Sequence, residues 1–427
     1  MRIMWVINSM IEEIAAKANR KAGFGGGWIP SMLDKLRSYR DVEMHLVVFG
    51  KVNSYFSEKS NNVEFHIFPD LPGLHKNGGG KPARDVWEII LQKAQPDVIH
   101  IYGTEQPTCI GLVENFPQVP AIVSLQGIIR EYYKHYYGDM EFGDILKYNA
   151  PVDVMLGSTG YFGRKRFKKK IPYEHRILNA VGYAEGRTNW DRKVSEDINP
   201  NLKYFDCKRM LRSEFYVSGE WDVNNINKHT LFTHQGNYAI KGLHYLIDAL
   251  AIIKRKYPDT VLKIAGQDPY GRTSFKGRMS INGYSRFIKN KIKSLNLEEN
   301  ICYLGPMGPE LIVEELKKAN VMVVPSSIEN SSNSIAEAMI TGTPCVASYV
   351  GGNPEMLGFG EFGLLYPFND PVLLADAVDR LFSSEELALG YSEKARAEAL
   401  KRHNRDLLTD NLYKIYNDVI NDSAGKE

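Results

Sequence analysis

Short apolar runs alternate along this chain with longer stretches in which apolar residues recur at helical spacing. The runs predict buried strands, and a glycine-rich loop after the first of them, Gly23–Trp28, leads into a helix. Alternation of this kind predicts parallel strands joined by helical crossovers. In the first half the expected strands are Met4–Ile7, His45–Phe49, Val98–Tyr102, Ala121–Leu125 and Val181–Tyr183, with helices over Ala83–Lys93 and Thr108–Asn115.

A second series of the same kind begins near residue 230, after the polar stretch Ser218–His229. The sequence therefore predicts an α/β protein of two doubly wound domains that face each other, with ligands in the cleft at the carboxyl ends of the strands. The expected domains are residues 1–217 and 230–405, separated by a linker at 218–229, and a C-terminal helix at 406–427 that crosses back to the first domain. The expected strands of the second series are Leu231–Thr233, Val261–Ala265, Ile301–Leu304, Met322–Val324, Cys345–Ala347 and Leu364–Tyr366, with helices that include Leu243–Lys256, Glu385–Arg402 and Leu407–Ile420.

Length and composition narrow the class of protein. A chain of 427 residues exceeds one ordinary core, which agrees with two domains. A net charge of +2 gives no field that would attract nucleic acid, and no run approaches the roughly 18 apolar residues of a membrane helix. The first apolar run is too short for a signal peptide, and the four cysteines have neither metal-ligand nor redox spacing. We therefore expect free thiols in a reducing compartment, and a cytoplasmic protein.

The most specific constellation of polar residues lies in Pro325–Met339. A hydrophobic strand runs into a polar loop, and Ser332 or Asn333 can cap the helix that follows. Backbone N–H groups at such a helix start form an anion site. The carboxylates of Glu329 and Glu337 suit sugar and ribose hydroxyls, because they accept paired hydrogen bonds. The alternative is a structural crossover whose glutamates are solvated.

Two glycine-containing loops are further candidates. Gly236–Gly242 lies between a strand and a helix, so Lys241 is expected at the lip of the cleft, where its ammonium group can neutralise a diphosphate. The alternative is an ordinary surface lysine at a helix start. Gly25, Gly26 and Gly27 follow the first strand, and glycines let a backbone approach a ligand closely, although many structural crossover loops also carry them.

The stretch from Tyr132 to Gly182 has no clear periodicity and contains a strongly basic run. Such a cluster is attracted to anionic lipid headgroups by about 1 kcal/mol per charge, and Phe167 in its middle would insert among them. The alternative is a solvated loop. His135 lies in a tyrosine-rich segment, where a packed aromatic cluster competes with a catalytic role. The expected membrane patch is Arg164, Lys165, Arg166, Phe167, Lys168, Lys169 and Lys170.

Taken in order, these segments resemble glycosyltransferase family 4, the retaining branch of the GT-B fold. The likeness covers about residues 230–380, and its glutamates form the family's E-x7-E motif. Gly186–Asp191 and Leu211–Tyr216 resemble members found in bacterial surface-polysaccharide clusters. The matching segments are Lys241-Gly242, Ile264–Gly266, Leu304-Gly305, Val323–Ser326, Glu329 to Met339, Gly342–Pro344 and Gly351–Glu355, with Asp97–Gly103 in the first half.

The resemblance implies a role for each matching residue. Glu329 would contact the donor sugar, Glu337 the nucleotide ribose, and Lys241 the diphosphate. The backbone N–H groups of Asn333 and Ser334 would hold the distal phosphate. The rest of the expected donor-binding set is Met307 at the nucleobase, Gly25, Gly26 and Gly27 over the diphosphate, and Gly236 and Asn237 beside the lysine, with Gln126, His135 and Glu105 on the acceptor or donor-sugar side.

Two positions depart from the family pattern. Asn237 stands where members usually carry an arginine, so the diphosphate charge is expected to rest on Lys241, the helix dipole and a basic residue of the 268–287 loop such as Arg272. Gln126 stands where members often have a histidine, and it cannot carry a proton, although it can hydrogen-bond the donor sugar. These departures keep a non-catalytic sugar-nucleotide-binding scaffold as an alternative.

The resemblance implies metal-independent transfer with retention at the anomeric carbon and no cofactor. The donor would be a UDP-, GDP- or ADP-sugar, and the acceptor a glycan or lipid-linked glycan of surface polysaccharide biosynthesis, reached from the inner face of the membrane. The acceptor hydroxyl would give its proton to the departing phosphate, so no protein nucleophile is required. No Asp-x-Asp triplet occurs in the chain. A nucleotide-sugar 2-epimerase shares the fold and is the enzymatic alternative, against which the E-x7-E motif argues.

Overall fold

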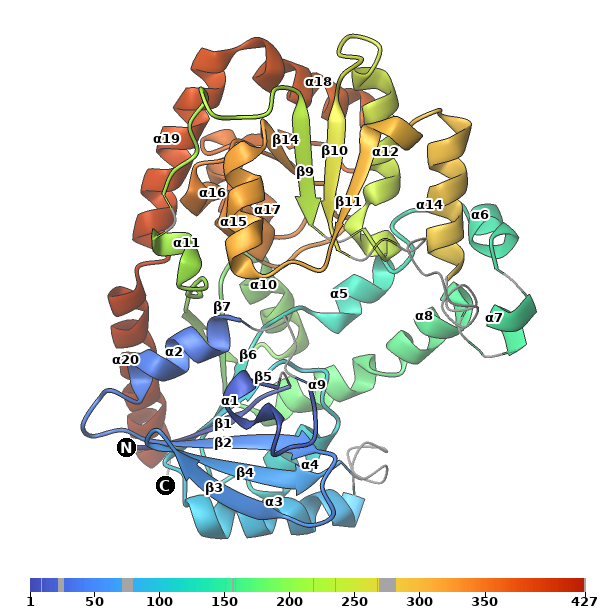
Figure 1. Ribbon diagram of the computed structural model, residues 1–427. Coiled ribbons are helices and arrows are strands. Elements are labelled where there is room, and N and C mark those ends of the chain that lie inside the picture. The colour runs from blue at the N-terminus through green and yellow to red at the C-terminus, as the bar shows by residue number, and fades with distance from the viewer. Residues whose placement is uncertain are drawn as a thin grey trace. The chain divides into compact units, whose positions relative to one another are not determined.

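The computed structural model describes residues 1–427 except residues 9, 22–26, 71–79, 150, 156, 158, 218, 235, 267, 269–281 and 426–427. The chain divides into two compact units. The first contains Met1–Arg130, Lys169–Met210 and His403–Glu427, and the second contains Glu131–Lys168 and Leu211–Arg402. The first and last elements, strand β1 (Arg2–Val6) and helix α20 (Arg405–Ala424), both lie in the first unit (Figure 1).

This division differs from the expected domains between residues 131 and 168. That segment lies in the first half of the sequence but belongs to the second unit, because its backbone carbonyl groups are bound there. The Nε2 atom of His244 lies 2.9 Å from the carbonyl oxygen of Gly138, and Arg286 donates to the carbonyl oxygen of Tyr148 at 2.7 Å. The first unit also gives way to the second at Met210, before the expected boundary at residue 217.

The first unit contains an eight-stranded sheet in the order β3-β4-β2-β1-β5-β6-β7-β8. The strands run parallel except β3, which pairs antiparallel with β4 at the edge. The strands are β1 (Arg2–Val6), β2 (Glu43–Gly50), β3 (Phe56–Ser60), β4 (Val63–Pro69), β5 (Val98–Tyr102), β6 (Ala121–Ser124), β7 (Tyr183–Gly186) and β8 (Lys203–Asp206). The helices are α1 (Glu12–Ala15), α2 (Trp28–Leu36), α3 (Gly80–Ala94), α4 (Thr108–Asn115), α9 (Ile171–Ala180), α10 (Asn189–Ile198) and α20, and α5 (Ile129–Lys134) begins here.

Helices cover both faces of this sheet, which explains why apolar residues predominate in its central strands. One face packs against α2 and α20, with Trp5, Leu46 and Tyr416 in the shared core. The opposite face packs against α3 and α4, where Trp87 and Cys109 are completely buried. All five residues of β5 are buried. Because both faces are covered, a polar group in the middle of a strand, such as His100, needs a partner inside the protein.

The second unit contains a six-stranded parallel sheet in the order β11-β10-β9-β12-β13-β14. Apolar cores lie on both of its faces, one around Leu246 and Ile264 and the other around Phe232 and Met339. The strands are β9 (Thr230–His234), β10 (Val261–Ala265), β11 (Ile301–Gly305), β12 (Val321–Val324), β13 (Cys345–Ser348) and β14 (Leu364–Tyr366). The helices are α6 (Phe142–Lys147), α7 (Pro151–Met155), α8 (Gly160–Lys168), α11 (Glu214–Val217), η2 (Ala239–Lys241), α12 (Leu243–Ile253), α14 (Gly283–Ser294), η3 (Glu298–Asn300), α15 (Pro309–Lys318), α16 (Asn333–Thr341), α17 (Asn353–Met356), η4 (Gly358–Gly360), α18 (Pro371–Ser383) and α19 (Glu385–Arg402).

Within the part of the chain that the structure describes, no helix has both the length and the hydropathy that crossing a bilayer requires. The expected polar loop at 268–283, with Arg272, lies almost entirely outside the described residues.

A buried hydrogen-bond cluster joins α20 to the first sheet. The indole N–H of Trp5 donates to the hydroxyl oxygen of Tyr416 at 2.9 Å, and Nδ1 of His100 lies 2.7 Å from the same oxygen. Trp5 and Tyr416 are completely buried, so neither group can exchange this partner for water. The last helix is therefore held by specific polar contacts as well as by apolar packing.

We predict that Tyr416→Phe lowers the free energy of unfolding of the first unit by about 1–3 kcal/mol, because it leaves the buried Trp5 donor without an acceptor. Urea titration followed by tryptophan fluorescence measures this, since Trp5, Trp28, Trp87 and Trp190 lie in the first unit and only Trp221 in the second. Tyr413→Phe is the matched control on the same helix, where the hydroxyl donates to Asp41 at an exposed position and its loss should cost below about 0.5 kcal/mol. Equal effects of the two changes would contradict the prediction.

Candidate functional site

The candidate site lies at the switch point of the second sheet. From β9 the chain proceeds outward to β10 and β11, and then it returns to β12 on the other side of β9 and continues to β13 and β14. The loops that follow β9 and β12 therefore leave neighbouring strands in opposite directions, which opens a crevice at their carboxyl ends where ligands bind in such sheets. Lys241 follows β9, and Glu329 follows β12.

Lys241 and Glu329 meet at this edge. The ammonium group of Lys241 donates to Oε1 of Glu329 at 2.6 Å, and the hydroxyl group of Ser326 donates to the same oxygen at 2.7 Å. Burial disfavours the charged ammonium group, but the adjacent carboxylate outweighs this and raises the pKa of Lys241 above its ordinary value. The ammonium group of Lys241 is therefore charged at neutral pH, and its contact with Glu329 is largely buried.

Two glycines allow the loops to approach each other this closely. Gly242 has φ +68°, and a Cβ atom there would overlap the carbonyl oxygen of Pro325. Gly351 has φ +50°, and a Cβ atom there would overlap the carbonyl oxygen of Glu329. The N–H of Gly352 donates to that same oxygen at 3.0 Å. Glycine at position 242 thus lets the backbone next to Lys241 approach the loop that follows β12. Glycine at position 351 likewise lets the backbone approach Glu329.

Glu337 lies on α16, one turn beyond the helix start. Ser332, not Asn333, caps this helix by accepting a hydrogen bond from the N–H of Ile335 at 3.4 Å. Arg212 donates to Oε1 of Glu337 at 2.9 Å. Burial raises the pKa of Glu337, and the guanidinium group of Arg212 opposes that rise. The carboxylate that the motif assigns to a ribose is therefore paired with an arginine from a distant segment.

His234, the last residue of β9, completes this group. Its Nε2 lies 3.6 Å from Oε2 of Glu337. Burial, with the cations Arg212 and Lys241 nearby, lowers the pKa of His234 to about 3. The imidazole is therefore neutral at pH 7, and its approach to the carboxylate is not an ion pair. A neutral ring of this kind can still donate or accept one hydrogen bond from a ligand.

Arg212 and His234 were not among the residues that the sequence led us to expect at this site. The position of His234 could have indicated a role at the site, because this residue ends a strand at the edge where ligands bind. The spacing of Arg212 gave no such indication, since 125 residues separate it from Glu337. Its position in Leu211–Tyr216 was noted only as a family resemblance.

The other expected donor-site residues lie in the same unit. Gly236 packs closely against Leu243, and Asn237 lines a hollow described below. Asn333 is exposed and Ser334 half-buried at the start of α16. Met307 packs against the apolar cluster that contains Ile312 and Met339, at the loop after β11.

A hollow of about 470 Å³ adjoins Lys241, and its lining includes six aromatic residues. Residues 131–168 supply much of its wall, and Tyr132 accepts a hydrogen bond from the N–H of Asn330 at 3.2 Å. His135 is close by in sequence, but its Nδ1 is buried and has no hydrogen-bond partner among the described residues. The lining includes Tyr132, Tyr136, Tyr137, Met140, Phe167, Arg166, Asn149, Asn237, Tyr238 and Lys241.

The basic run is helical rather than a loop. Residues 164–168 end α8, and Arg164 lies over the rings of Tyr133 and Tyr137 at 4.4 and 5.2 Å. Phe167 packs against Tyr136 with 5.7 Å between ring centroids and lines the aromatic hollow. Arg166 donates to the carbonyl oxygen of Gly157 at 2.7 Å. Phe167 thus packs against another part of the protein, which differs from its expected insertion among headgroups, and Lys165, Arg166, Lys168 and Lys169 are the exposed cations of the run.

In the first unit the expected residues lie near its own switch point, between β1 and β5. Asn8, which follows β1, donates to Glu105, which follows β5. Burial raises the pKa of Glu105. Gln126 follows β6, and its carbonyl oxygen accepts a hydrogen bond from Arg187 at 3.1 Å. Gly27 is half-buried immediately before α2, whereas Gly25 and Gly26 lie outside the described residues.

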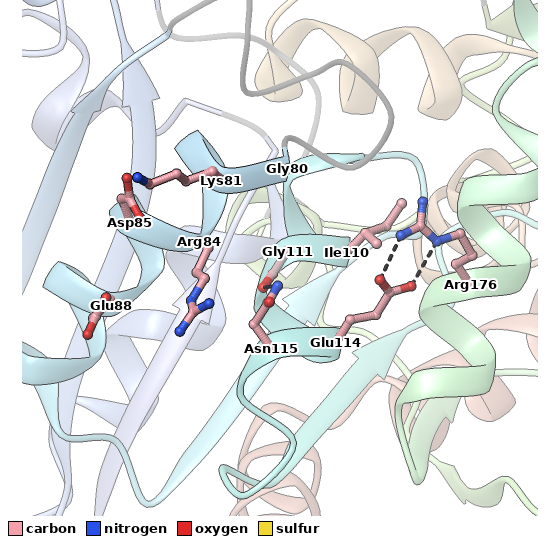
Figure 2. A pocket seen from close by; sticks show the side chains of 10 residues that line it. All are labelled: Gly80, Lys81, Arg84, Asp85, Glu88, Ile110, Gly111, Glu114, Asn115 and Arg176. Carbon is pink, nitrogen blue, oxygen red and sulfur yellow. Dashed lines mark hydrogen bonds and ion pairs between the residues drawn. The ribbon is translucent and has the colours of Figure 1, made fainter.

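A second hollow, of about 600 Å³, lies between α3 and α4 of the first unit (Figure 2). Its lining carries three cations and three carboxylates. Arg176 and Glu114 pair through two hydrogen bonds of 2.8 and 2.6 Å. Because the charges balance, the hollow favours neither anions nor cations. The charged lining residues are Lys81, Arg84, Arg176, Asp85, Glu88 and Glu114.

The Arg212–Glu337 pair makes a prediction about stability. Arg212→Gln should lower the free energy of unfolding at pH 7 by about 3 kcal/mol, because it leaves a buried carboxylate without its cation. The pKa of Glu337 then rises further above its unfolded value, so the folded variant binds a proton more tightly than the unfolded one. The loss in free energy of unfolding relative to wild type is therefore largest at neutral pH, and it decreases as the pH falls towards about 4.

Urea titration followed by circular dichroism at pH 5 and pH 8 measures that deficit. The double variant Arg212→Gln with Glu337→Gln should recover most of the lost stability, because a neutral amide replaces the unpaired carboxylate. A deficit of equal size at both pH values, or no recovery in the double variant, would show that Arg212 does not act through Glu337.

Comparisons with known proteins agree with this arrangement. A family model described as glycosyl transferases group 1 matches residues 221–398, which contain all the second-unit strands and both motif glutamates. N-acetyl-alpha-D-glucosaminyl L-malate synthase of Bacillus anthracis is 23% identical over 411 residues, or 93% of this chain and 95% of the relative. D-inositol 3-phosphate glycosyltransferase of Corynebacterium efficiens is 36% identical over 155 residues, or 36% of this chain and 35% of the relative.

Solved structures show the same fold over nearly the whole chain. Sucrose-phosphate synthase from Thermosynechococcus elongatus matches with a TM-score of 0.70 and 15% identity, over 98% of this chain and 99% of that one. Anabaena Alr3699/HepE in complex with UDP and glucose matches with a TM-score of 0.66 and 16% identity, over 97% and 99%. The expected resemblance and fold are confirmed: the chain has the two Rossmann-like units of the GT-B fold, and its residues 221–398 match the model of the glycosyl transferases group 1.

Proposed function

We propose that this glycosyltransferase moves a sugar from a nucleoside-diphosphate donor to a glycan or lipid-linked glycan, with retention at the anomeric carbon and without a metal. The observation that carries the proposal is the 2.6 Å pair of Lys241 and Glu329 at the switch point of the second sheet. One cation and one carboxylate, both largely buried, there face the position where ligands bind in such sheets.

The ion pairs of the site suggest how a donor is bound. A diphosphate competes with Glu329 for the ammonium group of Lys241, and its two phosphates carry more negative charge than one carboxylate. Once Lys241 has turned to the phosphate, Glu329 becomes free to accept hydrogen bonds from sugar hydroxyls. Arg212 and Glu337 permit the same exchange, which leaves Glu337 to accept from the ribose.

Arg212 also compensates, in this proposal, for the first departure from the family pattern. Asn237 removes the arginine that family members usually place next to the lysine. Arg212 supplies a second cation to the same site, from a segment that precedes β9. We therefore expect the diphosphate to meet two cations, Lys241 and Arg212, without the loop at 268–287.

Charge stabilisation of the leaving group is the main catalytic contribution in this proposal. The departing diphosphate gains negative charge in the transition state, and fixed donors that are already oriented stabilise it without reorganisation. Glu329 accepts hydrogen bonds from both Lys241 and Ser326, which supports a role as a binding group rather than as a nucleophile. The acceptor hydroxyl gives its proton to the departing phosphate, which is the step expected for a retaining enzyme of this kind.

The aromatic hollow beside Lys241 supports a glycan acceptor. Sugar rings have apolar faces that pack on aromatic rings, and Tyr132, Tyr136 and Tyr137 line the hollow together with amide groups able to bind hydroxyls. The names of two relatives contain L-malate and D-inositol 3-phosphate, so these compounds are the alternative acceptors to test. The solved Anabaena protein is described in complex with UDP-glucose, so UDP-sugars are the first donors to test, before GDP- and ADP-sugars.

We expect purified protein to release UDP from a UDP-sugar at a rate that an acceptor glycan increases, with an α-anomeric product from an α-linked donor. Lys241→Met should lower kcat by about 100-fold or more while uridine affinity is unchanged, because only diphosphate stabilisation is lost. Initial-rate assays and proton NMR of the product measure these quantities.

Lys263→Met is the matched control for this change. It breaks another Lys–Glu pair in the same unit, with Glu315 at 2.7 Å, on strand β10. Its turnover should equal that of wild type. Wild-type turnover in Lys241→Met would remove Lys241 from the mechanism, and a β-anomeric product would show inversion. UDP-sugar binding without turnover would favour the scaffold alternative, and a released epimeric nucleotide sugar the epimerase alternative.

Membrane association is proposed as a consequence of a lipid-linked acceptor. It rests on the three exposed lysines of the basic run and acts within a Debye length, about 8 Å at physiological ionic strength. We predict that the protein co-sediments with anionic but not neutral liposomes at low salt, and that replacing Lys165, Lys168 and Lys169 with Glu abolishes this. Replacing the scattered exposed lysines Lys228, Lys318 and Lys394 with Glu changes the net charge equally and should have a smaller effect. Identical sedimentation of the two triple variants would refute a specific patch.

A further inference from the structure

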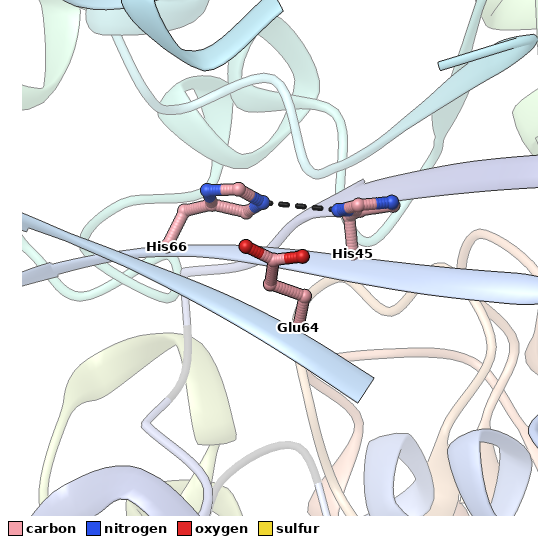
Figure 3. A group of neighbouring side chains, drawn as sticks. All are labelled: His45, Glu64 and His66. Carbon is pink, nitrogen blue, oxygen red and sulfur yellow. Dashed lines mark hydrogen bonds between the residues drawn. The ribbon is translucent and has the colours of Figure 1, made fainter. Parts of the chain in front are cut away.

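Three side chains with metal-ligand chemistry lie together on the first sheet (Figure 3). His45 is on β2, and Glu64 and His66 are on the neighbouring strand β4. In the parallel register His45 lies beside Glu64, and His66 is two residues further along β4. Alternate residues of a strand point to the same face, so all three side chains share the face that α3 covers.

The distances within this group suit a small cation. Nδ1 of His45 lies 3.0 Å from Nε2 of His66, and one oxygen of Glu64 lies within 4.8 Å of both. A zinc ion about 2.0–2.1 Å from each nitrogen in tetrahedral geometry separates them by about 3.4 Å. Small rotations of the two rings and of the flexible Glu64 side chain therefore bring all three atoms to bonding distance.

We propose that His45, Glu64 and His66 bind a divalent transition-metal ion, zinc foremost, with water at the fourth position. Two imidazoles and one carboxylate are ligands that zinc prefers and that magnesium, which requires oxygen ligands, does not. Among the described residues, this is the one group of three such side chains close enough to share an ion.

The surroundings would orient both rings for this purpose. Nδ1 of His66 lies 3.1 Å from the hydroxyl oxygen of Tyr55, so an N–H there can donate to that oxygen while Nε2 binds the ion. Nε2 of His45 is buried without a hydrogen-bond partner among the described residues, and it lies 3.7 Å from the carboxylate of Glu43. Metal-bound histidines commonly direct the other N–H to a carboxylate or oxygen acceptor in this way.

Metal binding here requires a tautomer change but no net loss of a proton. Nδ1 of His45 and Nε2 of His66 share one hydrogen, and binding moves it to the other nitrogen of the ring that carries it. Nδ1 of His66 would then direct its hydrogen to the Tyr55 hydroxyl oxygen and Nε2 of His45 its hydrogen towards Glu43, so both ligating nitrogens present a lone pair.

The nearby cations do not prevent this. Arg2, Lys59 and Lys93 face the group and oppose a bound ion. Arg2 pairs with Asp97 at 3.5 Å, and the ammonium group of Lys93 lies over the Tyr55 ring at 4.5 Å from its centroid. Glu43 and Glu64 add negative charge on the same side. Glu64 is only partly buried, which leaves a path for the ion from solvent.

The position of the group argues for a structural role. His45 and Glu64 lie near the amino ends of their strands, whereas substrates of doubly wound sheets bind at the carboxyl ends. The ion would tie β2 to β4 beneath α3. Its removal should therefore leave the chemistry of glycosyl transfer unchanged, and this inference does not depend on the proposed function.

Zinc titration of the full chain tests the proposal. Protein dialysed against a chelator, in a Cys302→Ser background because Cys302 is an exposed thiol, is titrated with zinc chloride by calorimetry and, separately, with Co²⁺ followed by its visible absorption. We expect one ion per chain, a four-coordinate Co²⁺ spectrum and no binding of Mg²⁺. Glu64→Gln should weaken zinc binding by about tenfold or more, and His66→Gln should abolish it.

Glu58→Gln is the matched control. Glu58 lies on the adjacent strand β3, opposite Phe65 and so on the other face of the sheet from Glu64. This variant should bind zinc as wild type does. Because His66 is completely buried and its replacement affects folding as well as binding, the partly exposed Glu64 gives the decisive comparison. No saturable zinc binding by wild type, or equal affinity in Glu64→Gln and Glu58→Gln, would overturn the proposal.

Discussion

Burial of both faces of two parallel sheets is the constraint on which the other features of this protein depend. In a strand covered on both sides, a charged side chain is costly unless it is paired, as Lys263 is with Glu315, or lies where the strand ends. Lys241, Glu329 and His234 all lie at or just beyond such ends in the second sheet, and Asn8 and Glu105 do so in the first. The same burial makes these few polar groups pair with one another, because an isolated charge there would be costly.

The sequence predicted strands in which apolar residues predominate and missed strands in which polar residues interrupt the pattern more often. β5, β10 and β14 were expected with the bounds that the structure has, because each is a short run with at most one polar residue. β3 is a polar edge strand, Phe56–Ser60, paired on one side only, and nothing in its composition marks it. β4 carries Glu64 and His66 among apolar residues, so its pattern is broken at the positions where the polar group lies. The polar residues that interrupt the apolar pattern of a strand can thus be the ones that are able to bind a ligand.

For the candidate site, the motif indicated the residues but not their partners. The order Lys241, Glu329, Glu337 is local to the second half of the chain and could be recognised from spacing and family resemblance. The contacts of Glu337 with Arg212 and of the 131–168 segment with the second unit depend on how the chain returns in space. Spacing carries no information about contacts across more than one hundred residues. The helical state of the basic run was missed for a related reason, since stacking of Arg164 on Tyr133 and Tyr137 offsets its charge repulsion.

The pairing of the site charges has a consequence for donor recognition. Lys241, Arg212, Glu329 and Glu337 carry two positive and two negative charges, so the group has no net field to attract a dianionic diphosphate from a distance. Selection must act at contact, when a phosphate displaces a carboxylate from its cation. A neutral sugar has no negative charge with which to displace a carboxylate from its cation. A lone phosphate engages only one of the two cations. A nucleoside diphosphate linked to a sugar can occupy both cations and both released carboxylates at once, which favours the intact donor over its separate parts.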